Sequence, residues 1–401
     1  MHETNEMSFK TIDDLGDVWG KTALVRADLN VPMAGGRVTD DSRIRAAVPT
    51  IQALLDKGAR VAVMSHFGRP KGHYVPELSL KPLTEPLAQA LGAPVAFAED
   101  CIGPAAETTL QNGAAVTLLE NLRFHEGEEA NEAGFVGALA TLGHVYVNDA
   151  FSAAHRAHAS TEGLAHRLPA AAGRSMESEI AALEMALSRP EHPVVALVGG
   201  AKVSTKLTVL SNLARKVDHL IIGGGMANTF LAAQGIDVKA SLCERDLIET
   251  ARAIAATADR VGCRLHLPRD AAVARVLKTG ADYRIAAVDA LEDGEMILDL
   301  GPTTVEALGA IVDEAKTMVW NGPLGAFEVP PFDQATLTLA RRAGERSRSG
   351  HLMSVAGGGD TVAALAQAGV KDAFSHISTA GGAFLEWMEG RVLPGVAVLQ
   401  R

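Results

Sequence analysis

Short apolar runs alternate with amphipathic stretches along the first half of this chain. The apolar runs have the length of buried strands, and they lie at 23–25, 61–64, 116–119 and 145–147. Apolar residues then recur at helical spacing from Ile44 to Leu55, and leucines do so from Leu80 to Leu91, before Gly92. Alternation of this kind predicts βαβ units and an α/β fold with mostly parallel sheets.

The second half of the chain repeats this pattern. Six further apolar runs are each expected to precede a turn and then a helix; they lie at 194–198, 219–222, 264–267, 296–300, 317–320 and 351–355. A chain of 401 residues is too long for one core of ordinary size, so we predict two domains. The boundary is placed on an amphipathic helix from about 174 to 188, which ends at Arg189-Pro190.

Composition and charge narrow the possible classes of function. The net charge is −11 and aromatic residues make up 4% of the chain, which disfavours nucleic-acid and anionic-membrane binding. Cys101, Cys243 and Cys263 lie far apart in the sequence, so neither a disulfide framework nor a zinc site is expected. The chain shows no signal-peptide pattern and no apolar run of membrane-spanning length, so we expect a cytoplasmic protein.

Arginines follow the apolar runs of the first half. Because the carboxyl ends of parallel strands meet at one edge of a sheet, we expect these side chains to lie together. Guanidinium groups match phosphate or carboxylate in bidentate fashion, so the predicted ligand is a small polyanion. Neighbouring carboxylate and amide groups would accept hydroxyl hydrogens or orient the arginines. The full set is Arg26, Asp28, Asn30, Arg43, His66, Arg69, Arg123 and Arg156.

Three histidines accompany these arginines. His155 and His158 are three residues apart without an acidic ligand in zincin spacing, so a metal site is disfavoured. We expect His66, His155 and His158 to be neutral or cationic donors to the ligand or to one another, and not to act directly in catalysis.

Glycine-rich turns follow the apolar runs of the second half. The segment from Gly199 to Lys206 follows a predicted strand and opens a helix, although it lacks the order of a Walker A loop. Free N–H groups at a helix start, together with lysines, suit phosphate groups. Lys202 and Lys206 are four residues apart, so we expect them on one face of that helix.

A second glycine run, Gly357-Gly358-Gly359-Asp360-Thr361, also follows a strand and begins a helix. Asp360 has two interpretations, which the sequence leaves open: it caps the helix, or its carboxylate holds Mg²⁺ on nucleotide phosphates. Glu328, in the segment 320–328, is a candidate for binding ribose hydroxyls. Two strand-end sites, one for a polyanion and one for a nucleotide, are typical of a group-transfer enzyme.

These motifs together resemble the phosphoglycerate kinase family, and the resemblance covers almost the whole chain. The motifs on the substrate side are 26–32, His66-Phe67-Gly68-Arg69-Pro70, 148–151 and 155–158. Those on the nucleotide side are 199–206, 223–227, 319–328 and 357–361.

The resemblance implies reversible, Mg²⁺-dependent phosphoryl transfer in glycolysis, between 1,3-bisphosphoglycerate with ADP and 3-phosphoglycerate with ATP. It implies that 3-phosphoglycerate is held by Asp28, Asn30, Arg43, His66, Phe67, Gly68, Arg69, Arg123 and Arg156. It implies that the nucleotide is held by Gly200, Ala201, Lys202, Lys206, Gly224, Asn321, Pro323, Glu328, Gly357, Gly358, Gly359, Asp360 and Thr361. Catalysis would fall to Arg43, Lys206, Gly381 and Gly382, with Asp360 holding the metal.

The resemblance also implies a monomer with two Rossmann-like, three-layer α/β/α domains that close by hinge bending. The expected parts are an N-terminal domain at 1–173, a linking helix at 174–189, a nucleotide domain at 190–378, and a segment at 379–401 that returns to the first domain. Three small departures from the family pattern concern loops, and one of them is Phe67 in place of a usual leucine. Ser152 replaces a common glycine, and Ala380 replaces another, which would cost roughly 1 kcal/mol if its φ were positive.

Two other classes of function stay open from the residues alone. A non-catalytic nucleotide-binding protein could use the same scaffold. A dehydrogenase is disfavoured, because no Gly-x-Gly-x-x-Gly opens the first helix and no ribose-binding acid follows at the usual distance.

Overall fold

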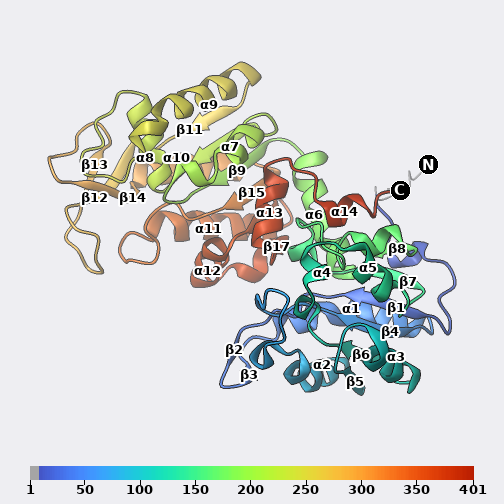
Figure 1. The fold of residues 1–401 in the computed structure, drawn as a ribbon. Helices are drawn as coiled ribbons and strands as arrows, with labels where there is room; N and C mark the ends of the chain where they lie inside the picture. The colour runs from blue at the N-terminus through green and yellow to red at the C-terminus, as the bar shows by residue number, and fades with distance from the viewer. Residues whose placement is uncertain (1–8) are drawn as a thin grey trace, which may run out of the picture. The chain divides into compact units, whose positions relative to one another are not determined.

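The computed structural model describes residues 9–401, which form two compact units. The first unit runs as far as Ala181 and includes Val392–Arg401, and the second is Ala182–Arg391 (Figure 1). The division falls within the stretch 174–188, on which the sequence places the domain boundary. The single-residue limits at 173, 189 and 378 stay predictions. Within residues 9–401, every helix is too short or too polar to cross a membrane.

A six-stranded parallel sheet forms the centre of the first unit. Its strands follow the order β5-β6-β4-β1-β7-β8. In that order they are Val95–Ala98, Val116–Leu119, Arg60–Met64, Thr22–Arg26, Val145–Asn148 and Ala170–Ala172. Strands β1, β6 and β7 are buried along their whole length and β4 is buried from Val61 onward, which explains why they read as continuous apolar runs. The predicted α/β fold with mostly parallel sheets is confirmed.

Helices of the first unit pack on this sheet through one apolar face. Helix α1 (Ser42–Asp56) contains Pro49 and buries Ile44, Ile51 and Leu54 against the strands. Gly92 ends α2 at φ 66°, a left-handed conformation that glycine adopts without strain. The other α-helices are α2 (Thr84–Leu91), α3 (Gly103–Gln111), α4 (Glu126–Glu129) and α5 (Ala133–Ala140). The short elements are η1 (Ile12–Asp14), β2 (Met33–Ala34), β3 (Arg37–Val38), η2 (Pro76–Leu78), η3 (Lys81–Leu83), η4 (Leu122–Phe124), η5 (Phe151–Ala153) and η6 (Gly163–His166).

The end of the chain completes the first unit. Helix α14 (Pro394–Ala397) contacts η5, and the Gly395 N–H donates to the Ala154 carbonyl at 2.9 Å (Figure 1). The Asn148 side chain donates to the Gly395 carbonyl at 3.2 Å. Near the other terminus, the Lys10 N–H donates to the Leu399 carbonyl at 2.8 Å. The first and last described residues are thus tied to the same sheet.

The second unit has a parallel sheet of its own, with the order β11-β10-β9-β15-β16-β17. These strands are Arg264–His266, His219–Ile222, Val194–Val198, Thr317–Asn321, Met353–Gly357 and His376–Ser378. The helices around it are η8 (Val203–Thr205), α7 (Leu207–Leu213), α8 (Gly225–Ala233), η9 (Arg245–Leu247), α9 (Ile248–Val261), α10 (Pro302–Glu314), α11 (Gln334–Arg348), α12 (Gly359–Gln367), η10 (Lys371–Ala373) and α13 (Gly381–Met388).

A small antiparallel sheet in the second unit departs from the sequence prediction. The helix expected after 264–267 is replaced by β12 (Asp270–Ala274), which pairs antiparallel with both β13 (Arg284–Ala287) and β14 (Met296–Leu300). The prediction of a helix there is wrong. The connections between these strands are too short for the crossover that a parallel pair needs, so the chain folds into hairpins.

The stretch 174–188 is helical, as the sequence predicts. Helix α6 (Arg174–Leu183) continues into the π-helical turn η7 (Glu184–Ser188). Its first turn is held by Asp149, which follows β7: Oδ1 accepts hydrogen bonds from the backbone N–H groups of Ser175 and Met176 at 2.9 and 3.1 Å. A carboxylate at this end of a helix satisfies free N–H groups and matches the positive end of the helix dipole.

Replacing Asp149 should change the stability of the protein and the pH dependence of that stability. Burial raises the pKa of Asp149 to about 7, above its ordinary value of 3.8. The unfolded chain therefore releases this proton first, and the group's contribution to stability falls as pH rises from about 4 to about 7. Asp149→Asn should abolish this decline while keeping the acceptor oxygen, and Asp149→Ala should cost about 1–3 kcal/mol. Urea unfolding at pH 5 and pH 8 measures both; an Asn variant with the parent's pH slope would contradict the assignment.

Candidate functional site

The strand order of the first unit brings the predicted anion-binding loops together. Strands β6, β4, β1 and β7 are neighbours in the sheet, and they end at Leu119, Met64, Arg26 and Asn148. Each of the loops that carry the predicted arginines and histidine follows one of these strands. The side chains therefore gather at the carboxyl edge of the sheet, the usual place for a ligand in an open α/β fold.

Asp28 holds Arg43 at this edge. Nη1 of Arg43 lies 2.9 Å from Oδ2 of Asp28 and donates to the Asn30 carbonyl at 3.1 Å. The Ser152 hydroxyl donates to Asp28 at 2.5 Å, so the serine that departs from the family pattern makes a contact with this carboxylate. About a third of the Arg43 side chain stays exposed, and its guanidinium is thus both oriented and accessible.

The loop after β4 is held by two amide side chains. The Gly68 N–H donates to the Asn30 side chain at 3.1 Å. Asn121 brackets Phe67: its Oδ1 accepts from the Phe67 N–H at 3.2 Å, and its Nδ2 donates to the Phe67 carbonyl at 2.8 Å. Gly68 has φ 62°, which allows the loop to turn back toward Asn30.

The remaining arginines differ in exposure. Arg123 is 4% exposed, donates to the Gly68 carbonyl at 2.9 Å, and forms an ion pair with Glu129 at 3.2 Å. Arg156 is half-buried, and its Nε donates to Nε2 of His155 at 3.1 Å. Arg69 is exposed. The arginines at this edge of the first sheet therefore range from buried to exposed.

Arg26 does not take the place expected of it. It is 1% exposed, and its guanidinium donates to the Ser160 hydroxyl, the Ala27 carbonyl and His66 at 2.9, 2.6 and 2.8 Å. The expectation of a ligand-facing fork at Arg26 is therefore wrong. A strand-end arginine and a buried strand residue look alike in sequence, because both follow an apolar run.

Burial and the neighbouring arginines together disfavour a positive charge on His66 and His158. Burial, followed by the positive charges of Arg26, Arg123 and Arg156, lowers the pKa of His66 well below its usual range. The same causes lower the pKa of His158 to about 4. Both rings are therefore neutral at pH 7, which settles a question that the sequence leaves open.

In the second unit, glycine loops from neighbouring strands pack backbone against backbone. The loops after β10, β9, β15 and β16 are adjacent in the sheet order. A Cβ atom on Gly199 would lie 1.8 Å from the Pro323 carbonyl oxygen, and one on Gly224 would lie 2.5 Å from that of Gly200. Gly322 has φ 100°, and its Cβ would lie 2.2 Å from the Gly199 oxygen. Only glycine allows this approach, which leaves peptide groups to form the surface.

Lys206 lies under these loops. Its Nζ donates to the carbonyls of Gly199 and Asn321 at 2.6 and 3.0 Å. Burial lowers the pKa of Lys206 to about 8, and Asp360 opposes this shift. Lys202 is different: it is exposed and extended (φ −132°, ψ 132°), ahead of helix α7, which begins at Leu207. The prediction of a shared helix face is wrong, because the glycine-led loop stays open longer than the periodic residues indicate.

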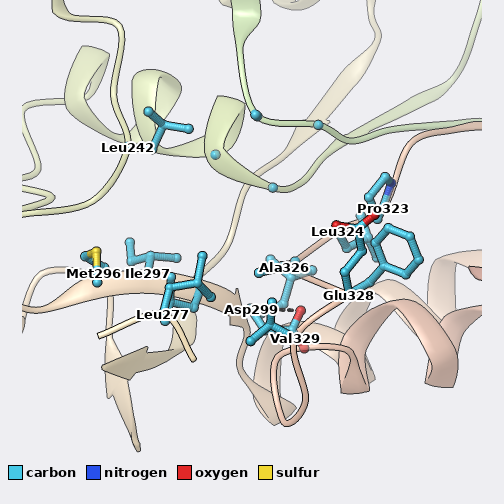
Figure 2. A pocket seen from close by; sticks show the side chains of 18 of the residues that line it. Leu242, Leu277, Met296, Ile297, Asp299, Pro323, Leu324, Ala326, Glu328 and Val329 are labelled. Atoms are coloured by element: carbon cyan, nitrogen blue, oxygen red, sulfur yellow. Dashed lines mark hydrogen bonds between the residues drawn. The ribbon is translucent and has the colours of Figure 1, made fainter. Parts of the chain in front are cut away.

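A pocket of about 380 Å³ opens beside the glycine loops, within the second unit. Apolar side chains gather at one end, among them Leu242, Met296 and Ile297, and the segment 323–328 lies at the other (Figure 2). Six of the thirteen predicted nucleotide residues line it, namely Gly200, Ala201, Gly224, Pro323, Glu328 and Asp360. The sequence does not predict this apolar wall, because apolar residues that line a pocket follow the same pattern along the chain as apolar residues of a core.

Asp360 faces the pocket from the first turn of α12. Gly358, at φ 97°, is the N-cap residue of that helix, so Asp360 does not occupy the cap position, and Asp360 is exposed. Of the two interpretations from the sequence, the structure favours a carboxylate available to a ligand. Behind it, Thr361 Oγ1 accepts from the Gly322 N–H at 2.7 Å, and Asn321 donates to the Gly357 carbonyl at 2.8 Å.

The start of helix α13 follows β17 at the same edge. Gly381 and Gly382 are its first two residues, and both are exposed. Ala380 has φ −109°, an ordinary conformation for a residue with a side chain. The strain that a positive φ would have caused at Ala380 is therefore absent.

One group of possible metal ligands lies together in residues 9–401: Asp100 and Cys101, which follow β5, and His125, which follows η4. Asp100 Oδ1 already accepts hydrogen bonds from Nε2 of His125 at 2.7 Å and from the Cys101 N–H at 2.6 Å. Burial raises the pKa of the Cys101 thiol well above its usual range, so it remains protonated. We therefore assign this group a structural role.

Comparisons with known proteins agree with the geometry. A family model described as phosphoglycerate kinase matches residues 12–391. The phosphoglycerate kinase of Zymomonas mobilis is 59% identical over 396 residues, which cover 98% of this chain and 100% of the relative. That of Ruegeria is 60% identical over 396 residues, with the same coverage. Among solved structures, the phosphoglycerate kinase of Coxiella burnetii has a TM-score of 0.91 at 41% identity and covers 98% of each chain.

Proposed function

Since this chain belongs to the phosphoglycerate kinase family and is a phosphotransferase, we propose that its two strand-end edges divide the reaction between them. The reaction is reversible phosphoryl transfer between 1,3-bisphosphoglycerate with ADP and 3-phosphoglycerate with ATP. This assignment of one ligand to each edge rests on the chemistry of the loops: one sheet ends in guanidinium groups, and the other ends in glycine loops beside an apolar pocket.

Phosphoglycerate would bind at the edge of the first unit. Arg43, Arg69, Arg123 and Arg156 supply positive charge for its phosphate and carboxylate groups. Asp28 and Asn30 orient Arg43 and Gly68, and they would accept a hydrogen bond from the ligand hydroxyl. The proposed contacts of this ligand are Asp28, Asn30, Arg43, His66, Phe67, Gly68, Arg69, Arg123 and Arg156.

The nucleotide would bind at the edge of the second unit. The apolar end of the pocket suits a base, and Glu328 suits the ribose hydroxyls. Peptide groups of the glycine loops and the first turn of α12 suit the phosphates. Besides Lys206, the proposed contacts are Gly200, Ala201, Lys202, Gly224, Asn321, Pro323, Glu328, Gly357, Gly358, Gly359, Asp360 and Thr361.

Magnesium would be held at Asp360. Its carboxylate is exposed, uncommitted to a helix cap, and lines the pocket, so it offers the oxygen ligand that Mg²⁺ prefers. When bound with the nucleotide, the ion would neutralise phosphate charge. We infer that a single protein carboxylate suffices, since Mg²⁺ commonly keeps several waters and phosphate oxygens.

Catalysis would rest on position and charge. A carboxylate is the acceptor in one direction and the leaving group in the other, so little proton transfer is needed. Arg43, Lys206 and the N–H groups of Gly381 and Gly382 would offset the charge on the moving phosphoryl group.

The two ligands bind to different units and must meet, so we propose hinge closure. Small-angle X-ray scattering should show compaction only when both ligands are present.

The activity itself has a direct test. The purified enzyme with ATP and 3-phosphoglycerate should release ADP, followed in a coupled assay, and omitting 3-phosphoglycerate should stop the release. ATP binding without this dependence would instead identify a nucleotide-binding protein that does not catalyse the transfer.

Sedimentation of the purified chain tests the proposed monomer.

Replacing Arg43 with alanine should lower kcat by roughly 10- to 100-fold, because a fixed positive charge beside the transferred group is lost. Arg45→Ala is the matched control: Arg45 lies two residues further along the same helix, is exposed, and pairs with Asp41. Steady-state kinetics at saturating ATP should show the loss in the first variant alone. An Arg43 variant that changes only KM would remove this residue from the proposed catalytic set.

A further inference from the structure

We propose that Arg26 is a positioning residue, which holds His66 in the neutral tautomer with its proton on Nε2. His66 would then offer a hydrogen-bond donor to the ligand without adding charge to the cluster of arginines. This inference rests on the proposed function, because phosphoglycerate is taken as the ligand that His66 meets.

The tautomer follows from the contact between the two side chains. Nη2 of Arg26 lies 2.8 Å from Nδ1 of His66. A guanidinium group carries only donors, so Arg26 must donate and Nδ1 must accept. A neutral ring that accepts at Nδ1 carries its hydrogen on Nε2. Nε2 has no protein partner in the described part of the chain and remains available to donate.

Arg26 cannot turn away from His66 without losing other contacts. It is 1% exposed; its Nε donates to the Ser160 hydroxyl at 2.9 Å, and its Nη1 donates to the Ala27 carbonyl at 2.6 Å. Ser160 is fixed in turn by Glu128, which lies 2.5 Å from its hydroxyl and accepts from its N–H at 3.0 Å. These contacts leave Nη2 directed at the imidazole, whatever the protonation state of Glu128.

The groups around His66 favour the same state. Burial opposes a positive charge on the ring, and so do three arginines: Arg26 from β1, Arg123 from η4 and Arg156 from the loop after η5. His158, from the same loop as Arg156, adds to this effect when it is protonated, and the pKa of His66 is lowered well below the usual range. Protonation would also place an N–H at Nδ1 against the N–H of Arg26. An anionic ligand would therefore meet a neutral donor.

The wild-type enzyme tests the tautomer directly. Long-range ¹H–¹⁵N correlation spectra, with His66 assigned by comparison with His66→Gln, report which ring nitrogen is protonated. We expect Nε2–H alone between pH 5.5 and pH 8, both with and without 3-phosphoglycerate. Protonation at Nδ1, titration near pH 6.5, or a doubly protonated ring in the complex would overturn the proposal. This measurement does not depend on any variant of Arg26 folding.

Arg26→Met tests the consequence for binding. Without Arg26 the tautomer is no longer fixed and the pKa of His66 should rise, so KM for 3-phosphoglycerate at pH 8 should increase roughly 10- to 100-fold. At pH 6 the ring protonates and donates from both nitrogens, so the ratio of variant to wild-type KM should shrink. A purely structural defect would leave that ratio constant with pH, and that result would contradict the proposal. Arg167→Met, at an exposed position of the same unit, is the control and should leave KM unchanged.

The same experiments separate this inference from the proposed ligand. If 3-phosphoglycerate shifts the His66 signals but the tautomer is wrong, the role of Arg26 fails and the ligand site stands. If the tautomer is right but 3-phosphoglycerate leaves the His66 signals and the KM of His66→Gln unchanged, the ligand assignment fails. In that second case the donor that Arg26 creates would serve something other than phosphoglycerate, and the proposal would be withdrawn.

Discussion

Replacing Lys206 with methionine should lower kcat by roughly 100- to 1,000-fold, because a preorganised cation at a developing negative charge is the kind of contact whose loss costs most. Methionine keeps the length and apolar stem of the lysine. The carbonyls of Gly199 and Asn321 would lose their shared donor, at 2.6 and 3.0 Å from Nζ. KM for ATP should change less than kcat if Lys206 acts mainly on the transferred group.

The pH profile of the wild type gives an independent measure of this role. The pKa of Lys206 is lowered to about 8, so the amine loses its positive charge as pH rises through that value. We therefore expect kcat/KM for the nucleotide to fall above pH 8. Bound phosphates favour the charged amine, so kcat itself should fall only at higher pH. Lys216→Met, at an exposed position after α7, is the matched control and should keep both values. Parent-like turnover in Lys206→Met would remove this residue from the mechanism.

Replacing Gly199 with alanine should destabilise the second unit by about 3 kcal/mol, because its Cβ would overlap backbone that has little room to move. The new atom would lie 1.8 Å from the Pro323 oxygen and 2.6 Å from its carbonyl carbon. Separating these loops would also disturb Lys206, which donates to the Gly199 carbonyl. We therefore expect weaker nucleotide binding together with lower stability.

Trp320 allows this loss to be followed within the second unit. It is buried, and its indole N–H donates to the Gly322 carbonyl at 2.8 Å, next to the affected loops. Urea unfolding followed by tryptophan fluorescence should show a lower midpoint for Gly199→Ala. Gly137→Ala is the matched control, because Gly137 lies in helix α5 with no atom within 4 Å of an added Cβ. Equal midpoints for the two variants would show that the loops adapt.

The sequence predicts the edges of both parallel sheets well, for a physical reason. A buried parallel strand reads as a short apolar run, and the residue types after it indicate whether the loop presents charge or bare backbone. Val194–Val198 and His219–Ile222 have the predicted bounds, and the fold class is confirmed. The order of the strands, which brings the loops together, is a property of tertiary structure that the pattern alone does not give.

Other features depend on contacts that sequence patterns do not encode. Arg26 follows the same kind of run as Arg123, yet each of its three guanidinium nitrogens donates to a group within the protein. Strands β12, β13 and β14 form a separate antiparallel sheet because the connections between them are short. The alternation of apolar and amphipathic stretches does not distinguish these connections from βαβ crossovers. Strand β14 of this sheet contributes Met296 and Ile297 to the pocket. Because the sequence does not predict the sheet, it does not predict this wall of the candidate nucleotide site either.

The return of the chain to the first unit has a consequence for biosynthesis. Gly395 and Leu399 are hydrogen-bonded to Ala154 and Lys10, so the first unit cannot complete its contacts until the codons for residues 395–399 have been translated. The second unit, Ala182–Arg391, is fully synthesised before those residues leave the ribosome. Domains generally fold as units during synthesis. The half that is made first should therefore be the last to reach its finished state.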